Sequence, residues 1–105
     1  MSSSEPRSFR FGVSTWGANS RTEWRNKARR AEAAGFDTLL IADHLVDGMY
    51  SSLAALVASA EATERLRVGT LVLNNDFRHP VLVAREAATV DLLTDGLAHD
   101  VDYAV

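Results

Sequence analysis

The stretch LLIADHL, residues 39–45, joins a run of apolar residues directly to an acid and an imidazole. A continuous apolar run with β-forming residues is typical of a parallel strand that is covered on both faces. We therefore predict a strand over residues 38–42, with Asp43 and His44 just beyond its carboxyl end. In α/β folds, ligands bind beyond this end of the strands, so both residues are candidates for a functional site.

The segments on either side of this strand repeat its pattern at near-equal intervals. Apolar and alternating runs predict two further strands, over residues 9–14 and 67–73. Helical spacing of apolar residues predicts three helices, over residues 21–34, 52–64 and 80–93. The spacing of Ser20 and Glu23 is that of a capping box, and Pro80 suits the first turn of a helix. The order β-α-β-α-β-α predicts an α/β fold with a parallel sheet.

The last segment, GLAHDVDYAV at residues 96–105, departs from this pattern. Val101, Tyr103 and Val105 alternate with other residues, which leaves a short fourth strand open. Three βα units leave a parallel sheet with exposed edges, and exposed edges are a liability in an isolated sheet. We therefore expect the chain to be truncated. We also expect it to associate through its open sheet edges, either with copies of itself as a homo-oligomer or with another chain.

Composition narrows the class of protein. The chain has 105 residues, which allows one small domain, and its net charge of −3 argues against a nucleic-acid partner. The basic run Arg25, Lys27, Arg29 and Arg30 lies on a predicted helix opposite the apolar positions, so we interpret it as a solvated face. The absence of cysteine excludes disulfides and thiolate catalysis.

The N-terminal residues carry no targeting signal that we can identify. MSSSEPRSFR has no apolar segment, so we predict a disordered leader over residues 1–8 rather than a signal peptide. No run approaches the roughly 18 apolar residues that a membrane helix needs, so we expect no membrane partner. A cytoplasmic location is the corresponding expectation.

Polar groups follow all three predicted strands, and each has a structural alternative to a functional role. His44 beside a carboxylate could be held in one tautomer and pass a proton, or the pair could cap the next segment. Asp43 could bind a ring hydroxyl or satisfy loop N–H groups. Asn74 and Asn75 could hold a polar ring edge or form a turn. Arg78 precedes a helix and could bind phosphate, but pairing with a neighbouring acid is the favoured interpretation.

Other motifs are set aside. The glycines of residues 12–17 have the spacing of a phosphate loop, but Ala18 and Asn19 stand where lysine and a hydroxyl residue are required. The three histidines lie far apart in the sequence, and there is no H-E-x-x-H motif, so we predict no metal site.

Three longer stretches together resemble a known family. RFGVST, AEAAGFDTLLIADHL and RVGTLVLNNDFRHPVLVAREAATVDLLTDG are similar to the luciferase-like monooxygenase superfamily, and most similar to its branch of oxidoreductases that use the deazaflavin coenzyme F420. The resemblance runs over residues 9–96. It divides the chain into a partial barrel domain over 9–96 and a divergent tail over 97–105, after the leader of residues 1–8.

The resemblance implies the N-terminal β-α-β-α-β-α portion of a TIM (β/α)8 barrel and hydride transfer between F420 and a small organic substrate. It places His44 at the position that faces the deazaflavin ring and assists proton transfer. It also implies a bulge in the third strand, with a non-prolyl cis peptide around residues 69–71. The cofactor-binding residues that it implies are Asp43, Thr70, Leu71, Asn74 and Asn75.

After Gly96 the sequence no longer follows the family, and a truncation or frame shift there would account for the change. Barrels of this type bind phosphate around their seventh and eighth strands, so the anchor for the cofactor tail is missing and stand-alone activity is not expected. Three alternatives stay open: an FMN-dependent monooxygenase of the same superfamily, a non-catalytic truncated remnant or oligomerising subunit, and another barrel class such as a sugar isomerase. The last would need metal-binding carboxylates at the strand ends, which Asp43 alone does not supply.

Overall fold

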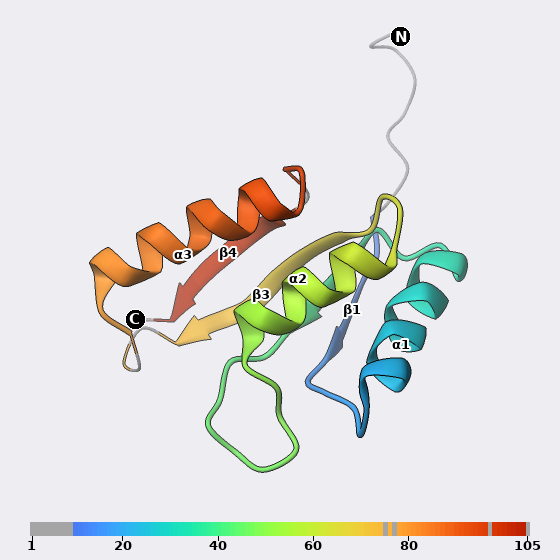
Figure 1. Cartoon of the computed structure of the whole chain (residues 1–105), viewed down its shortest axis with the longest axis horizontal. Helices are drawn as coiled ribbons and strands as arrows, with labels where there is room; N and C mark the ends of the chain where they lie inside the picture. The colour runs from blue at the N-terminus through green and yellow to red at the C-terminus, as the bar shows by residue number, and fades with distance from the viewer. Residues whose placement is uncertain (1–9, 75, 77, 97, 105) are drawn as a thin grey trace, which may run out of the picture.

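Strands and helices alternate along the chain (Figure 1). The computed structural model describes residues 10–74, 76, 78–96 and 98–104. The elements are β1 (Gly12–Thr15), α1 (Arg21–Ala33), β2 (Thr38–Ile41), α2 (Ser52–Ala62), β3 (Arg67–Asn74), α3 (Pro80–Leu93) and β4 (Ala98–Ala104). The three predicted strands and three predicted helices are all present, with bounds that differ by a few residues at most. The predicted leader, residues 1–8, lies outside the described residues.

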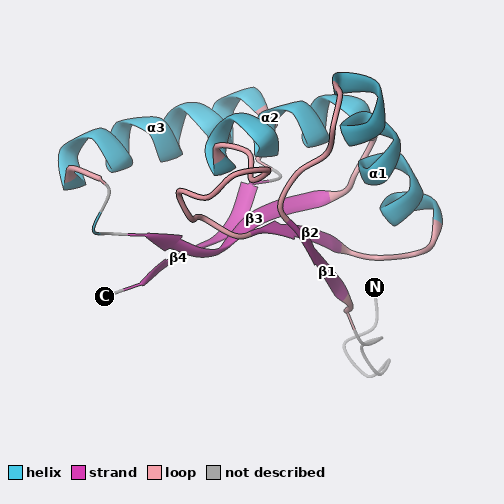
Figure 2. Ribbon diagram, turned by 90° about the horizontal axis from the view of Figure 1, so that it is seen from below, coloured by secondary structure: helices cyan, strands magenta, loops and turns pink. Residues whose placement is uncertain are grey.

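The four strands form one parallel sheet in the order β1-β2-β3-β4. All three helices pack on the same face of this sheet, and the opposite face is left uncovered (Figure 2). Neighbours in sequence are therefore neighbours in the sheet, as in a (β/α)8 barrel that has not closed. Within the described residues, β1 and β4 each have one edge without a paired strand. The predicted α/β class is confirmed, and β4 forms where the sequence left a strand open.

Helix α1 begins and ends at the predicted signals. The Ser20 hydroxyl accepts a hydrogen bond from the Glu23 N–H at 3.1 Å, which satisfies one free donor of the first turn. At the other end, Gly35 has a φ of +92°, in the left-handed region that glycine adopts without steric cost. The Phe36 N–H then donates to the Ala31 carbonyl at 3.1 Å, which closes the helix and directs the chain into β2.

The core lies between the sheet and the helices. Its largest fully buried side chains come from β2, α2, β3 and the turn before β3, and they are Leu39, Ile41, Leu56, Leu66, Val68 and Leu73. Trp24 joins α1 to this core and donates its indole N–H to the Ala55 carbonyl of α2 at 3.1 Å. None of the helices in the described ranges is both long enough and apolar enough to cross a bilayer.

Strand β3 is irregular near its centre. The peptide bond between Leu71 and Val72 is cis, at the end of the span 69–71 around which the resemblance implied a non-prolyl cis peptide. The register between β3 and β4 also shifts on both sides of Thr70, as expected for a bulged strand. Leu71 is 48% exposed, whereas Thr70 beside it is fully buried. Leu71 therefore lies on the face of the sheet that the helices leave open.

The Thr70 hydroxyl is buried and has no hydrogen-bond partner within the described residues. Such an atom costs about 1–3 kcal/mol, so Thr70→Val, which keeps the shape, should raise the free energy of unfolding by about 1 kcal/mol. Urea unfolding followed by circular dichroism would measure the change. Thr63→Val is the matched control, because the Thr63 hydroxyl donates to the Ser59 carbonyl at 2.9 Å and its removal should bring no gain. An unfolding midpoint for Thr70→Val no higher than that of the parent chain would contradict this prediction.

Candidate functional site

The carboxyl ends of the parallel strands bring distant polar segments to one end of the sheet. We call this end the strand-end rim and define it by Trp16 after β1, Asp43 and His44 after β2, and Asn74 at the end of β3. Its loops are joined by backbone contacts: the Tyr50 N–H donates to the Trp16 carbonyl at 2.8 Å. The β1 and β2 ends of the rim are thus held together before any ligand is considered.

Gly17 lies where these two loops meet. A Cβ atom at this position would come within 2.6 Å of the Gly48 carbonyl oxygen, so no larger residue fits without moving the backbone. The Lys27 ammonium group of α1 donates to the Gly17 carbonyl at 2.6 Å and fixes the same turn from the helix side. The close approach accounts for a glycine here, where the sequence had indicated only a failed phosphate-loop motif.

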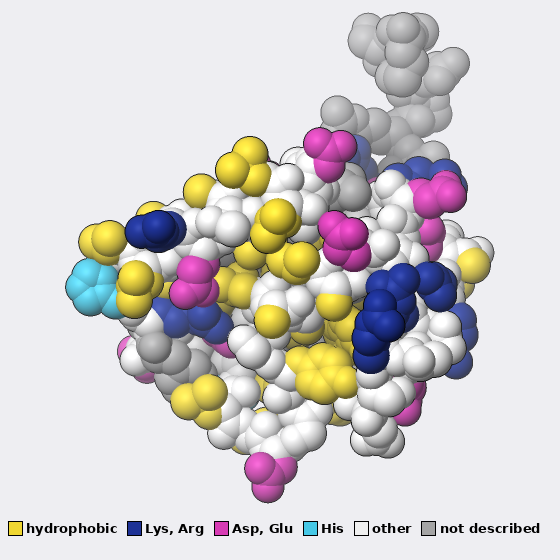
Figure 3. All heavy atoms as spheres, viewed as in Figure 1, with side chains coloured by type: hydrophobic (Ala, Val, Ile, Leu, Met, Phe, Trp, Pro, Cys, Tyr) yellow, Lys and Arg dark blue, Asp and Glu magenta, His cyan; other side chains and the backbone are white. Residues whose placement is uncertain are grey.

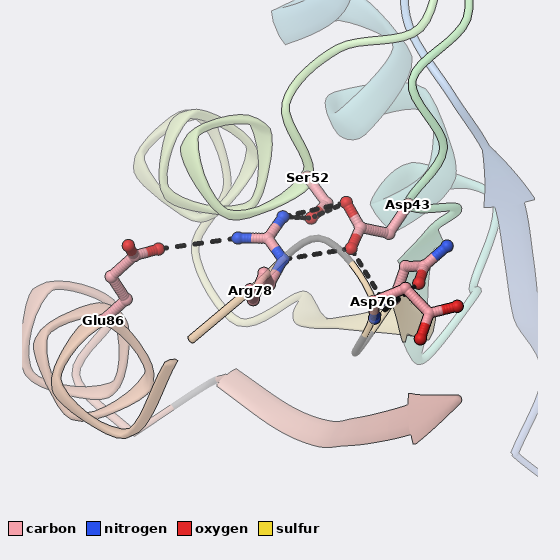
Figure 4. A network of polar contacts seen from close by, with 6 residues as sticks. Asp43, Ser52, Asp76, Arg78 and Glu86 are labelled. Atoms are coloured by element: carbon pink, nitrogen blue, oxygen red, sulfur yellow. Dashed lines mark hydrogen bonds and ion pairs between the residues drawn. The ribbon is translucent and has the colours of Figure 1, made fainter. Parts of the chain in front are cut away.

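Asp43 is the centre of a buried polar network (Figure 4). It is only 5% exposed. Its Oδ1 accepts from the Ser52 hydroxyl at 3.0 Å and from the Arg78 Nη2 at 2.9 Å. Its Oδ2 accepts from the Asn74 N–H at 2.7 Å and from the Arg78 Nε at 3.2 Å. Asp43 therefore satisfies a backbone N–H group, as one interpretation of the sequence had it, but this group belongs to the last residue of β3 rather than to a loop, and an ion pair with Arg78 is added.

These contacts keep Asp43 ionised. Burial of the carboxylate raises its pKa, but the hydrogen bonds from the Arg78 guanidinium, the Asn74 N–H and the Ser52 hydroxyl outweigh burial. The net pKa of Asp43 lies below the ordinary aspartate value. Asp43 at neutral pH is consequently a fixed negative charge and is not suited to donate a proton.

Arg78 has two weaker partners, and the first is the Ser52 hydroxyl oxygen, which accepts from Nη2 at 3.4 Å. The Arg78 Nη1 lies 3.6 Å from Glu86 in α3, whose side chain is 50% exposed, whereas the Arg78 side chain is 18% exposed. The favoured interpretation of Arg78 as a residue that pairs with a neighbouring acid is confirmed. His79 beside it is the N-cap of α3, where its Nδ1 accepts from the Val81 N–H at 3.2 Å, and Pro80 stands in the first turn as predicted.

His44 differs from Asp43 in both burial and hydrogen bonding. It is exposed, and no hydrogen bond to its imidazole is present within the described residues. An adjacent carboxylate can orient an imidazole, but the Asp43 oxygens bond to Ser52, Asn74 and Arg78 instead. That pairing is not formed, because the Asp43 carboxylate is buried with its four donors while His44 is exposed. The His44 imidazole is left available to a ligand.

A hollow of about 350 Å³ adjoins this network. It is lined by residues 43–47 and 49–51 of the β2–α2 loop and by Arg78. The hollow combines the imidazole of His44 with apolar side chains such as Leu45, which is itself exposed. Its size is at the lower end for a small-molecule site.

The other residues implied by the resemblance lie in different surroundings. Leu71 is exposed on the open face of the sheet, but Thr70 offers no surface to a ligand in this structure. Asn74 uses its Oδ1 to accept from the Asp76 N–H at 2.9 Å, so the turn-forming interpretation holds for its carbonyl oxygen. Asn75 lies outside the described residues. Cofactor contacts by these residues stay predictions.

Two features of the site were not found from the sequence. Ser52 was not singled out, although the serine pair at the start of α2 was a signal for a helix N-terminus, and its hydroxyl bonds to Asp43. The bidentate contact from Arg78 to Asp43 was also missed, because the two residues are 35 apart in the chain. Among the residues that the structure describes, no three His, Asp or Glu side chains gather closely enough to hold a metal ion.

The chain is similar to known proteins over most of its length. The family model of the luciferase-like monooxygenases matches residues 8–96. The F420-dependent glucose-6-phosphate dehydrogenase of Amycolatopsis mediterranei is 37% identical over 76 residues, which are 66% of this chain and 23% of that protein.

Two solved structures share the fold. The coenzyme F420-dependent tetrahydromethanopterin reductase of Methanopyrus kandleri matches with a TM-score of 0.76 and 28% identity, over 87% of this chain and 26% of that one. The oxygenating constituent of 3,6-diketocamphane monooxygenase from Pseudomonas putida, in complex with FMN, matches with a TM-score of 0.77 over 92% of this chain and 29% of that one. The identity in the second case is 15%, so that likeness concerns the fold alone.

The chain spans about a quarter of the length of these proteins. The matched part of each is a portion of a TIM barrel, in agreement with the consecutive parallel strands β1 to β4. Because the family model covers most of the residues and the fold agrees with it, the chain belongs to the luciferase-like monooxygenase family.

Proposed function

We propose that this chain forms the N-terminal part of an oxidoreductase that transfers hydride between coenzyme F420 and a small organic substrate. The observation that carries the proposal is the contrast at the end of β2, where a buried and fully bonded Asp43 is followed by an exposed His44 without a protein partner. An imidazole placed in this way can exchange a proton with a bound molecule. Similarity to the F420-dependent dehydrogenase of Amycolatopsis mediterranei supports the choice of cofactor.

The strand-end rim and the open face of the sheet together suit a flat ring with a polar edge. Leu71 supplies an exposed apolar side chain on the uncovered face of the sheet, and His44 supplies a hydrogen-bonding group. Asn74 has a carboxamide N–H₂ group left over after its Oδ1 is used in the turn. When bound, the deazaflavin supplies the carbon that accepts or releases hydride. In the proposal Leu71 packs against the ring, His44 moves the accompanying proton, and Asp43 stays ionised throughout.

Further predictions belong to this proposal. Thr70 and Asn75 stay candidates for cofactor contact, and the substrate is a small organic molecule rather than a nucleic acid or a membrane lipid. A cytoplasmic location and an association with a second chain through the edges of β1 and β4 are also proposed. FMN is the alternative cofactor, in which case the reaction is oxygenation of the substrate. A non-catalytic subunit is the second alternative.

The cofactor can be tested in a complete barrel. Residues 9–96 of this chain would replace the matching segment of the Amycolatopsis mediterranei dehydrogenase, and the folded hybrid would be titrated with F420 and with FMN. Because the dehydrogenase supplies the site for the cofactor tail, the hybrid tests the ring-facing part of the pocket, and its dissociation constant for F420 is expected to lie within about tenfold of that of the intact dehydrogenase. Tighter binding of FMN than of F420 would select the monooxygenase, and a folded hybrid that binds neither would sink the proposal.

His44→Ala in the same hybrid tests the catalytic residue. General acid–base catalysis contributes about 10²–10⁴-fold to a rate, so a loss of kcat in that range is expected, with little change in the unfolding midpoint. His79→Asn is the control histidine variant, because asparagine can still cap α3. Unchanged kcat in His44→Ala would remove His44 from the mechanism while leaving the cofactor assignment intact.

A further inference from the structure

We infer that Arg78 is a positioning residue, which fixes Asp43 and thereby holds His44 in place at the strand-end rim. Arg78 lies in the turn between β3 and α3, but its side chain reaches back to the segment that follows β2 (Figure 4). The inference rests on the proposed function only for the chemical role of His44. The mechanical part of it depends on contacts within this chain alone.

The contact between Arg78 and Asp43 is the strongest of those that Arg78 makes, since Nη2 is 3.4 Å from the Ser52 hydroxyl oxygen and Nη1 is 3.6 Å from Glu86. Nη2 and Nε donate to separate oxygens of Asp43 at 2.9 and 3.2 Å, in the forked geometry that only arginine provides. The side chains of the pair are 18% and 7% exposed. The contact to Glu86 is longer, at 3.6 Å, and Glu86 is half-exposed, so it contributes little to holding the guanidinium.

The Asp43 carboxylate has no acceptor capacity left for a ligand. A carboxylate offers about four lone-pair sites, and four donors occupy them: the Ser52 hydroxyl, the Asn74 N–H, and two N–H groups of Arg78. These donors come from α2, β3 and the turn before α3. Through these hydrogen bonds Asp43 connects α2, β3 and the turn before α3 to the end of β2. Its role is therefore structural, and it does not contact a bound molecule.

The position of His44 depends on that of Asp43, the residue before it. Its Cα is one peptide unit, about 3.8 Å, from the Cα of Asp43, whereas its own side chain is exposed and makes no hydrogen bond to the described part of the chain. Residues 45–48, which follow, are all exposed. Loss of the Arg78 fork would consequently release Asp43, Asn74 and His44 together.

Arg78→Lys tests the inference, because lysine keeps the positive charge and loses the fork. Amide hydrogen exchange and the imidazole signals of His44 would be followed by NMR in the chain without ligand. The Asn74 N–H, which bonds to Asp43, is expected to exchange at least tenfold faster and the His44 signals to shift. The Val68 amide in the core of β3 should exchange at its original rate.

Arg85→Lys is the matched control. Arg85 is an exposed arginine of α3 with no ion pair within the described residues, so its replacement should change neither the Asn74 N–H nor His44. If Arg78→Lys does not fold, Ser52→Ala takes its place, since it removes one of the four donors and should move the His44 signals in the same direction.

Two results would overturn the inference. One is a folded Arg78→Lys, or Ser52→Ala, in which Asn74 exchange and the His44 signals are unchanged. The other is equal acceleration at Asn74 and Val68, which would mean a general loss of stability rather than a local release. Failure of the hybrid barrel to bind F420 or FMN would overturn the proposed function and would leave these ligand-free measurements to decide on Arg78.

Discussion

Trp24→Ala is expected to lower the free energy of unfolding by about 3–5 kcal/mol, the range for removing a buried tryptophan. Trp24 belongs to α1, is 2% exposed and packs against α2. Its indole N–H donates to the Ala55 carbonyl at 3.1 Å, and its ring meets Tyr50 edge-on, with centroids 5.3 Å apart. Because small domains have only about 5–15 kcal/mol of stability in total, this variant should be largely unfolded in mild denaturant.

Guanidinium unfolding followed by circular dichroism would measure this loss. Trp24→Phe is the matched control, because it keeps an aromatic ring in contact with Tyr50 and removes the hydrogen bond to Ala55. Its own cost should be about 0.5–1.5 kcal/mol, the net contribution of one hydrogen bond, since the Ala55 carbonyl inside α2 still accepts a backbone N–H of the helix. Equal stability of the alanine and phenylalanine variants would show that the ring adds nothing to the packing of α1 on α2.

Asp43→Ala should cost about 3–5 kcal/mol at neutral pH, because it leaves the largely buried Arg78 guanidinium without its partner. The loss should depend on pH. The pKa of Asp43 is lowered in the folded chain, so its contribution is complete above the ordinary aspartate pKa and disappears as the pH falls through that value to the lowered one. The unfolding midpoints of the parent chain and of Asp43→Ala are therefore expected to converge below about pH 4.

The parent chain must be compared with Asp43→Ala because a second carboxylate, Glu32, also has a lowered pKa. Burial raises the pKa of Glu32, but the N–H groups of Arg65, Glu64 and Leu66 outweigh it, so the net pKa is also lowered. Glu32 consequently loses stabilising contacts in the same acidic range, in the parent chain and in the variant alike. The difference between the two midpoints isolates Asp43. A difference that stays constant from pH 7 to pH 3 would contradict the assignment of the lowered pKa to this residue.

The elements of the fold were predictable because each carries a local signal. Ser20 begins α1 and Gly35 follows its end, and the apolar run 38–41 becomes β2. Local signals are sufficient here because the βα repeat brings each strand against the preceding one. The fourth strand was left open because alternation at Val101 and Tyr103 is a weak signal without a helix to follow it.

The sequence predicted where the candidate site lies in the fold, but not which residues contact one another there. The position of Asp43 and His44 at a strand end followed from the sequence, whereas the partners of Asp43 did not. Arg78 reaches Asp43 only because β2 and β3 are adjacent and because the chain turns after Asn74. No spacing within either segment encodes that approach. The exposure of His44 beside a buried Asp43 is likewise not specified by the two letters DH.

The sheet order has a consequence for symmetry. A second chain could extend this sheet next to β4 or next to β1. To keep the sheet parallel, its strands would have to run in the same direction as β1 to β4. Two copies related by an axis perpendicular to the strands would pair in opposite directions and place their His44 residues at opposite ends. A rotation axis parallel to the strands would instead keep every strand aligned, and the rims of all copies would then surround one shared mouth.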